Sequence, residues 1–244
     1  MRYKLTIEYD GGAFSGWQKQ RGPITVQAVL EKAIQTAVRE PVDLQGSGRT
    51  DTGVHALGQV AHFDCASEQD TYILRESLNA LVRPYPISVR LIEPVPDDFH
   101  ARFSAKGREY LYRIQNTRCP PALNRDRVWW VPQPLDESVM QQAADLLIGR
   151  HDLSTFRAAH CQAKSPVKTI DELTVCRDGD EIHIRIKARS FLYHQVRNIT
   201  GSLVQVGMGK WSVADFQEAF MACDRKRGAE TAPACGLYFV KVTY

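Results

Sequence analysis

The chain has 244 residues, of which 43% are hydrophobic and 24% charged, as in ordinary globular proteins that bury a sizeable core. Its formal net charge of +3 is too small to indicate a nucleic-acid partner by itself, although clustered lysines and arginines would still form a basic face. No apolar run reaches membrane-spanning length. The cysteines show no CxxC pair and no zinc-ligand spacing; they lie at positions 65, 119, 161, 176, 223 and 235. We therefore expect a reduced cytoplasmic protein without metal or membrane contact.

The first part of the chain alternates strand-like and helix-like patterns. In chain order, apolar periodicity and turn residues predict a strand over 3–9, a helix over 26–39 with Thr25 as its N-cap, strands over 42–45 and 59–65, a helix over 72–81 and a strand over 87–92. This β-α-β-β-α-β order is typical of two helices on one face of an antiparallel sheet. The loop over 10–18 carries Phe14 and Trp17, which either pack as a lid on the core or stack on a planar ligand.

The second part repeats this plan in outline. The patterns predict a strand over 108–114, a linker over 116–127, a helix over 137–148, a hairpin of strands over 169–176 and 181–188, helices over 191–206 and 213–221, and a strand over 237–242. The expected fold is therefore α+β, with two related ferredoxin-like or RRM-like halves whose antiparallel sheets join across a central cleft. We expect the domains to comprise residues 1–105, with the glycine-rich loop over 46–56, and residues 106–244.

Residues 46–56, Gly-Ser-Gly-Arg-Thr-Asp-Thr-Gly-Val-His-Ala, form the most informative stretch. Its three glycines indicate backbone with positive φ or close approach of another group, and strand patterns flank it on both sides. Arg49 and Asp51 lie between these glycines. Such a loop carries catalytic groups in many enzymes, but the spacing alone favours a glycine-rich hairpin whose charges face water.

Several further stretches give the chain a family resemblance that runs nearly end to end. The stretches are Tyr9-Asp10-Gly11, Gly16–Gln20, Thr25–Gln27, Leu30-Glu31, Gly48–Asp51, Gly53–Ala56, Phe99–Ala105, Tyr110–Ile114, Phe156–Ala158, Cys161-Gln162, His194–Ile199, Thr231–Ala234 and Gly236–Tyr238. In this order they resemble the TruA family of tRNA pseudouridine synthases. Thr52 stands where the family commonly has alanine.

The resemblance implies roles for particular residues. Asp51 matches the family's catalytic aspartate, Tyr110 its active-site tyrosine, and Arg49 and Arg197 basic residues near the aspartate. A carboxylate nucleophile divides a difficult bond exchange into two easier steps, and a nearby arginine keeps it ionised and oriented. Tyr110 would stack on the uracil once that base leaves the helical stack, although strand tyrosines usually belong to the core. For His55 we favour a loop-orienting or RNA-contacting role over general-base catalysis.

The implied reaction converts uridines at positions 38, 39 and 40 of the tRNA anticodon stem-loop to pseudouridine, with no cofactor, in a homodimer that binds tRNA. Whether Asp51 attacks C1′ or C6 of the nucleotide stays open. The Arg-Lys-Arg run at 225–227 is a solvated loop in the general case and a candidate phosphate contact in an RNA enzyme. Two other functions are alternatives: a non-catalytic RNA-binding module of RRM-like fold, and a glycosidase-like hydrolase, which would need a second carboxylate.

Overall fold

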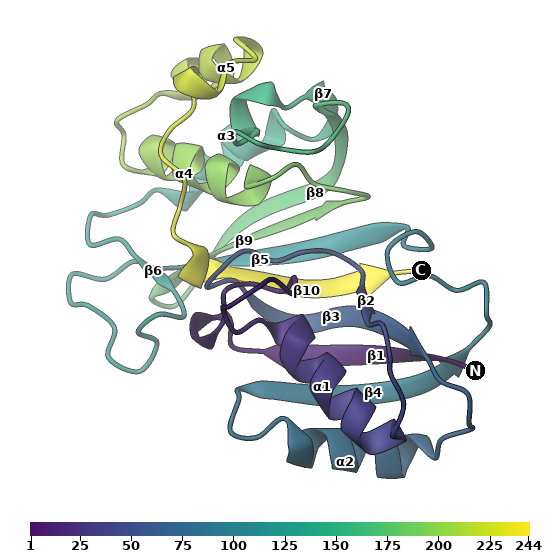
Figure 1. Cartoon of the computed structure of the whole chain (residues 1–244). Coiled ribbons are helices and arrows are strands. Elements are labelled where there is room, and N and C mark those ends of the chain that lie inside the picture. The colour runs from purple at the N-terminus through teal and green to yellow at the C-terminus, as the bar shows by residue number, and fades with distance from the viewer. The chain divides into compact units, whose positions relative to one another are not determined.

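The structure is a computed structural model that describes all residues 1–244. It is a mixed α/β protein with five α-helices (Figure 1), which agrees with the predicted class at this coarse level. The chain divides into two compact units, which we call unit 1 (1–106 and 238–244) and unit 2 (107–237). None of the helices is both long enough and apolar enough to span a membrane.

Unit 1 contains a sheet with two helices on one face (Figure 1). Its elements are β1 (Arg2–Tyr9), α1 (Val26–Val38), β2 (Gln45–Gly46), β3 (His55–Asp64), α2 (Thr71–Leu81), β4 (Ile87–Val95) and β10 (Leu237–Thr243). The strand order is β4-β1-β3-β10, and β2 pairs with β3. All pairs are antiparallel except β10 with β3, which run parallel with Tyr238 opposite His55.

The local sequence explains the central elements of unit 1. Every second residue of β1 is buried, from Tyr3 to Tyr9, as expected when one face of a strand covers the core. The Thr25 hydroxyl accepts a hydrogen bond from the Ala28 N–H, so that α1 begins at the predicted cap. Asp70 caps α2 in the same way.

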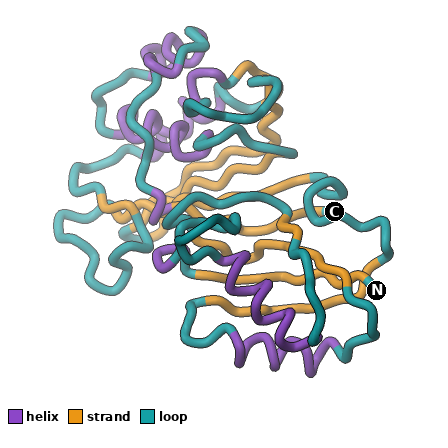
Figure 2. The backbone as a smooth tube through the Cα atoms, viewed as in Figure 1, coloured by secondary structure: helices purple, strands orange, loops and turns teal.

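Unit 2 contains paired strands and three α-helices (Figure 2). Its elements are β5 (Gly107–Gln115), β6 (Trp129–Trp130), α3 (Glu137–Asp145), β7 (Gly149–Asp152), β8 (Val167–Asp178), β9 (Glu181–Ala188), α4 (Gln195–Gly207) and α5 (Val213–Met221). The strand order is β5-β9-β8-β7, antiparallel throughout, with the short β6 parallel to β5. Gly179, with φ of +57°, lies in the tight turn between β8 and β9, within the predicted hairpin.

The predicted strand over 42–45 is wrong for most of its length, because β2 comprises only Gln45–Gly46. Leu44 is fully buried, but side chains of α1 satisfy its backbone. The Gln27 Nε2 donates to the Leu44 carbonyl at 2.8 Å, and the Leu44 N–H donates to Glu31 Oε1 at 3.4 Å. The alternating pattern over 42–45 therefore corresponds to a buried segment whose backbone forms hydrogen bonds with side chains of a helix instead of with a strand.

Several other boundaries also differ from the prediction. The strand expected from residue 59 begins at His55, because Ala56 pairs with Tyr9 on one side and with Phe239 on the other. The helix expected from 191 begins at Gln195, after His194 with φ of +59°. The helix expected to reach 148 ends at Asp145.

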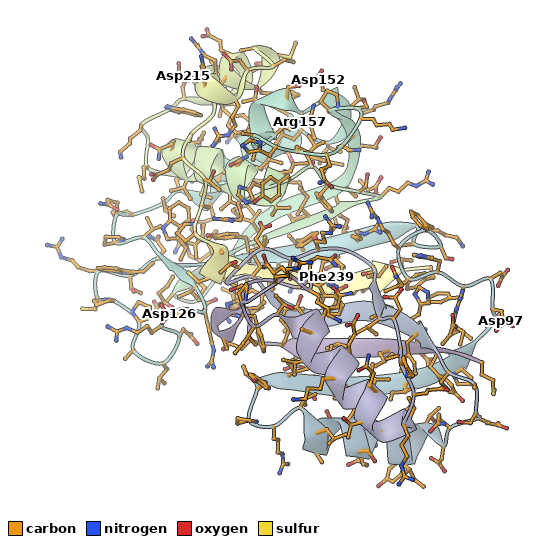
Figure 3. All side chains as sticks on the ribbon, viewed as in Figure 1. Asp97, Asp126, Asp152, Arg157, Asp215 and Phe239 are labelled. Atoms are coloured by element: carbon orange, nitrogen blue, oxygen red, sulfur yellow. The ribbon has the colours of Figure 1, made fainter.

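The final strand lies in a different unit from the one expected. We expected residues 106–244 to form the second domain, whereas residues 238–244 belong to unit 1. The cause is pairing between distant residues: Tyr238 and Phe239 of β10 lie opposite His55 and Ala56 of β3. Phe239, labelled in Figure 3, is fully buried as a result.

Candidate active site

The glycine-rich loop between β2 and β3, residues 47–54, is held at its base by buried polar contacts. Ser47 and Gln59 are both almost completely buried. The Ser47 hydroxyl donates to Gln59 Oε1 at 2.7 Å, and Gln59 Nε2 donates to the Gly48 carbonyl at 3.0 Å. A buried side-chain network of this kind fixes backbone that has no regular secondary structure.

The middle of the loop is fixed from the opposite side by residues 9–17. The Thr50 hydroxyl lies 2.7 Å from the Tyr9 hydroxyl in a buried contact, and the Thr50 carbonyl accepts the Trp17 N–H at 3.0 Å. Burial raises the pKa of Tyr9 to about 12, so that its hydroxyl keeps its proton for this contact at neutral pH. Trp17 is 1% exposed and is thus a core residue that supports the loop.

Asp51 follows directly after this fixed residue and begins a tight turn. The Val54 N–H donates to the Asp51 carbonyl at 3.1 Å, and Gly53 has φ of +80°, as the third position of a type II turn requires. Asp51 is half-buried and Arg49 exposed. Arg49 Nε donates to Gln18 Oε1 at 3.0 Å.

His55 lies inside unit 1 and not on its surface. Its side chain is 2% exposed, and its ring stacks on Tyr238 with centroids 4.7 Å apart. The Nδ1 atom lies 3.1 Å from both the Gly11 N–H and Asp10 Oδ1. The Gly11 N–H donates to this nitrogen, so His55 ties residues 10–11 to the start of β3.

Tyr110 and Tyr112 lie on the same face of β5 but in different surroundings. Tyr110 is half-buried and packs edge-to-face against Phe191, with centroids 5.0 Å apart. Tyr112 is fully buried, and its hydroxyl donates to the Pro233 carbonyl at 2.6 Å. Of the two rings, therefore, Tyr110 has exposed surface to offer a base.

Arg197 lies in the first turn of α4 and is half-buried. Its Nε donates to the Ala232 carbonyl at 2.7 Å, and the Ala232 N–H donates to the Arg197 carbonyl at 3.2 Å. The Arg197 side chain is therefore held against the segment that leads into β10.

Two further residues with possible chemistry have structural surroundings. Burial raises the pKa of the Cys161 thiol, but hydrogen bonds from the Tyr193 and Ala163 N–H groups and Arg157 outweigh it and lower the pKa overall. Arg157, labelled in Figure 3, donates to the Cys161 and Ala163 carbonyls. Arg225, from the run considered for phosphate contact, instead donates to Asn198 Oδ1 and Thr231 Oγ1, each at 3.2 Å.

The structure thus places Arg49, Asp51 and His55 in unit 1, and Tyr110 and Arg197 in unit 2. Sequence reasoning did not single out Tyr9, Thr50 or Gln59, which fix the loop. Only Tyr9 and Thr50 lay within stretches that carried the family resemblance, and Gln59 carried no such signal. A half-buried carboxylate on a rigid, glycine-bounded loop is an arrangement suited to nucleophilic catalysis.

Comparisons with known proteins identify the class of enzyme. A sequence model of the family described as tRNA pseudouridine synthase matches residues 5–104 and 143–244. A Bartonella tribocorum protein named tRNA pseudouridine synthase A is 51% identical over 245 positions, covering 100% of this chain and 99% of that protein. A Xanthobacter autotrophicus protein of the same name is 54% identical over 243 positions, covering 100% and 99%.

The chain therefore belongs to the tRNA pseudouridine synthase family. The resemblance seen in the sequence is confirmed, and with it the expectation of an isomerase that forms pseudouridine in tRNA.

Proposed function

We propose that Asp51 is the nucleophile with which this enzyme isomerises uridine in tRNA. The observation that carries the proposal is the placement of its carboxylate: Asp51 is half-buried and directly follows Thr50, which contacts from Tyr9 and Trp17 fix in the core. A nucleophile held in this way meets the reacting atom without first ordering a mobile loop.

The reaction exchanges one bond of the nucleotide for another. The N1–C1′ bond breaks, the detached uracil turns, and a C5–C1′ bond forms; the C5 proton is lost and N1 gains one. Attack by Asp51 at C1′ and attack at C6 both fit this balance. Either course needs an ionised carboxylate and no change of oxidation state.

We assign supporting roles to the other predicted residues. Tyr110, half-buried with part of its surface exposed, offers a stacking surface for the displaced base. Arg49 and Arg197 supply positive charge for the carboxylate or for RNA phosphates. The burial and stacking of His55 support a loop-orienting role and make direct contact with RNA unnecessary for its function.

The finer substrate and assembly assignments extend the family resemblance. We propose that the target uridines are those at positions 38–40 of the anticodon stem-loop, and that the enzyme acts as a homodimer in the cytoplasm. Six free thiols are in keeping with a reducing compartment. Sedimentation of the purified protein at twice the monomer mass of 27.6 kDa is the expected result for the dimer.

We also propose that each unit is ferredoxin-like. In unit 1, the antiparallel order β4-β1-β3-β2, with α1 and α2 on one face, supports this proposal. In unit 2, the antiparallel order β5-β9-β8, with α3 and α4 after β5 and β9, supports it in the same way.

Product analysis of modified tRNA tests the proposed function against its alternatives. Incubation of the enzyme with an unmodified tRNA transcript, followed by nuclease digestion and chromatography, should yield pseudouridine in place of uridine at positions 38–40. A glycosidase would release free uracil and leave abasic sites. An RNA-binding module would leave every uridine unchanged, and either of these results would refute the proposal.

A further inference from the structure

Residues 231–236, which we call the brace segment, connect the loop after α5 to β10 and are fixed along their whole length. The Thr231 hydroxyl donates to Asn198 Oδ1 at 2.7 Å, and the Cys235 thiol lies 3.4 Å from the Val128 carbonyl. A Cβ on Gly236 would lie 2.5 Å from the Tyr112 ring, so glycine is needed where this segment crosses β5.

The centre of the brace segment holds Arg197. The Ala232 carbonyl accepts a hydrogen bond from Arg197 Nε at 2.7 Å, while the Ala232 N–H donates to the Arg197 carbonyl at 3.2 Å. Backbone and side chain of Arg197 are thus both bonded to one residue. Since Nε lies at the root of the guanidinium plane, the position of the Ala232 carbonyl determines where that plane points.

The next residue, Pro233, links the position of the Ala232 carbonyl to that of its own carbonyl. The proline ring holds its φ near the observed −52°. The relative orientation of the Ala232 and Pro233 carbonyls therefore depends on one free torsion only, ψ of Pro233. The Pro233 carbonyl accepts the Tyr112 hydroxyl at 2.6 Å. Pro233 itself is exposed and Tyr112 fully buried, so this hydroxyl anchors the exposed residue to the core.

From these contacts we infer that Tyr112 is a positioning residue for Arg197, acting through the Pro233 and Ala232 carbonyls. The inference rests on the proposed role of Arg197 in the site. Burial raises the pKa of Tyr112 well above its ordinary value, which keeps the hydroxyl protonated and donating. Tyr112 lies two residues from Tyr110 on the same face of β5, so the strand that carries the stacking tyrosine also carries the anchor for the arginine.

Tyr112→Phe separates this role from packing, because it keeps the ring in the core and removes only the hydroxyl. We expect kcat for pseudouridine formation to fall roughly tenfold to a hundredfold, as a displacement of about 1 Å at a reacting group does. The KM for tRNA should change by less than about twofold, because phosphate contacts elsewhere supply most affinity. Tyr3→Phe is the matched control: Tyr3 is equally buried, and its hydroxyl accepts the Gln69 N–H, remote in sequence from the brace segment.

The decisive comparison is a double-variant cycle with Arg197→Ala. If Tyr112 acts through Arg197, the double variant Tyr112→Phe/Arg197→Ala has the same kcat as Arg197→Ala, within about twofold. If the fold-reduction of kcat in the double variant were instead the product of the two single-variant reductions, the inference would be overturned, because Tyr112 would then act independently of Arg197. Pro233→Ala changes an exposed residue and keeps both carbonyls but frees φ. It should therefore also lower kcat, and it tests the inference should Tyr112→Phe fold poorly.

Failure of this inference differs from failure of the proposed function. Parent-like kcat in both Tyr112→Phe and Pro233→Ala, with a strongly impaired Arg197→Ala, would overturn the positioning role alone. Parent-like kcat in Arg197→Ala would remove Arg197 from the site and overturn both its proposed role and the inference. Neither result would bear on Asp51.

Discussion

The backbone of Gly16 lies directly against the loop that carries Asp51. Its φ is +82°, and a Cβ at this position would lie 2.6 Å from the Thr50 carbonyl and 3.2 Å from the Asp51 carbonyl carbon. Gly22 also has positive φ, +100°, but a Cβ there would meet no atom within 4 Å. The two glycines therefore differ in whether a side chain would move the candidate nucleophile.

Gly16→Ala should reduce kcat by roughly a hundredfold, because a displacement of about 1 Å at a nucleophile has an effect of that order. Gly22→Ala carries a similar backbone cost of about 1–2 kcal/mol and should keep nearly full activity. Steady-state kinetics on a tRNA transcript, with thermal unfolding of each variant, makes the comparison. Equal losses of activity in the two variants would contradict the explanation by steric displacement.

His62, near the end of β3, is a buried histidine. Its ring lies 4.7 Å from that of His100, and its Nδ1 accepts the Ala101 N–H at 3.2 Å. Burial, with smaller contributions from His100 and Arg2, lowers the pKa of His62 to about 4, against an opposing contribution from Asp64. The unfolded chain therefore binds more protons than the folded one between about pH 6.5 and 4.

It follows that the stabilisation from neutral His62 is fully present above about pH 6.5 and is lost as the pH falls toward 4. His62→Gln, whose amide oxygen can still accept the Ala101 N–H, should flatten the pH dependence of the free energy of unfolding over this range. Urea denaturation at pH 7, 6 and 5 measures it, with His160→Gln, at an exposed position, as the control. An unchanged slope in His62→Gln would contradict the burial explanation.

At the scale of elements, the sequence predicted best where local chemistry decides the structure. The helix over Val213–Met221 was predicted at both ends, and Ser212 and Asp215 form a capping box at its start. The hairpin of β8 and β9 follows from its Asp-Gly turn. Prediction was less accurate where a partner distant in sequence determines the structure. The Leu44 backbone forms hydrogen bonds with side chains of α1, and His55 belongs to β3, where it pairs with Tyr238 of β10.

The short helix Arg225–Arg227 shows the same limit for a charged run. Sequence reasoning treated its three basic residues alike, yet Arg225 is half-buried and bonded to Asn198 and Thr231, while Lys226 and Arg227 are exposed. Burial lowers the pKa of Arg225. Composition alone does not reveal which residue of such a run points inward.

Arg225→Ala should therefore lower the free energy of unfolding by about 1–2 kcal/mol, from lost hydrogen bonds to buried polar groups, whereas Lys226→Ala should leave it within about 0.5 kcal/mol of the parent. Chemical denaturation of both variants tests this difference. The account of Arg225 would be wrong if the two substitutions had equal effects, or if Lys226→Ala were the more destabilising.

For the whole molecule, the sequence predicted the mixed α/β class, but it grouped the last strand with residues 106–244. Residues 238–244 belong to unit 1, because parallel pairing between β10 and β3 joins residues about 180 positions apart in the chain. No local pattern encodes such a pairing. The candidate nucleophile itself was predictable from its motif, while the residues that fix it, Tyr9 and Gln59, became evident only from their contacts.

The central claim for the molecule is that Asp51 supplies the nucleophile and that the rest of the loop serves to hold it. Asp51→Asn keeps the size of the side chain and its capacity to accept hydrogen bonds, but replaces the carboxylate with a very poor nucleophile. If Asp51 served only to shape its turn, this substitution would be nearly silent, because asparagine suits turns equally well. The Asn variant should fold and bind tRNA about as tightly as the parent, since phosphate contacts dominate affinity.

Single-turnover release of tritium from tRNA labelled at C5 of uridine, measured beside filter binding of the same tRNA, tests this claim most directly. We predict no release above background by Asp51→Asn at enzyme concentrations that bind all the tRNA, and complete release by the parent enzyme. Substantial release by a folded, tRNA-bound Asp51→Asn variant would contradict the assignment of Asp51 as the nucleophile.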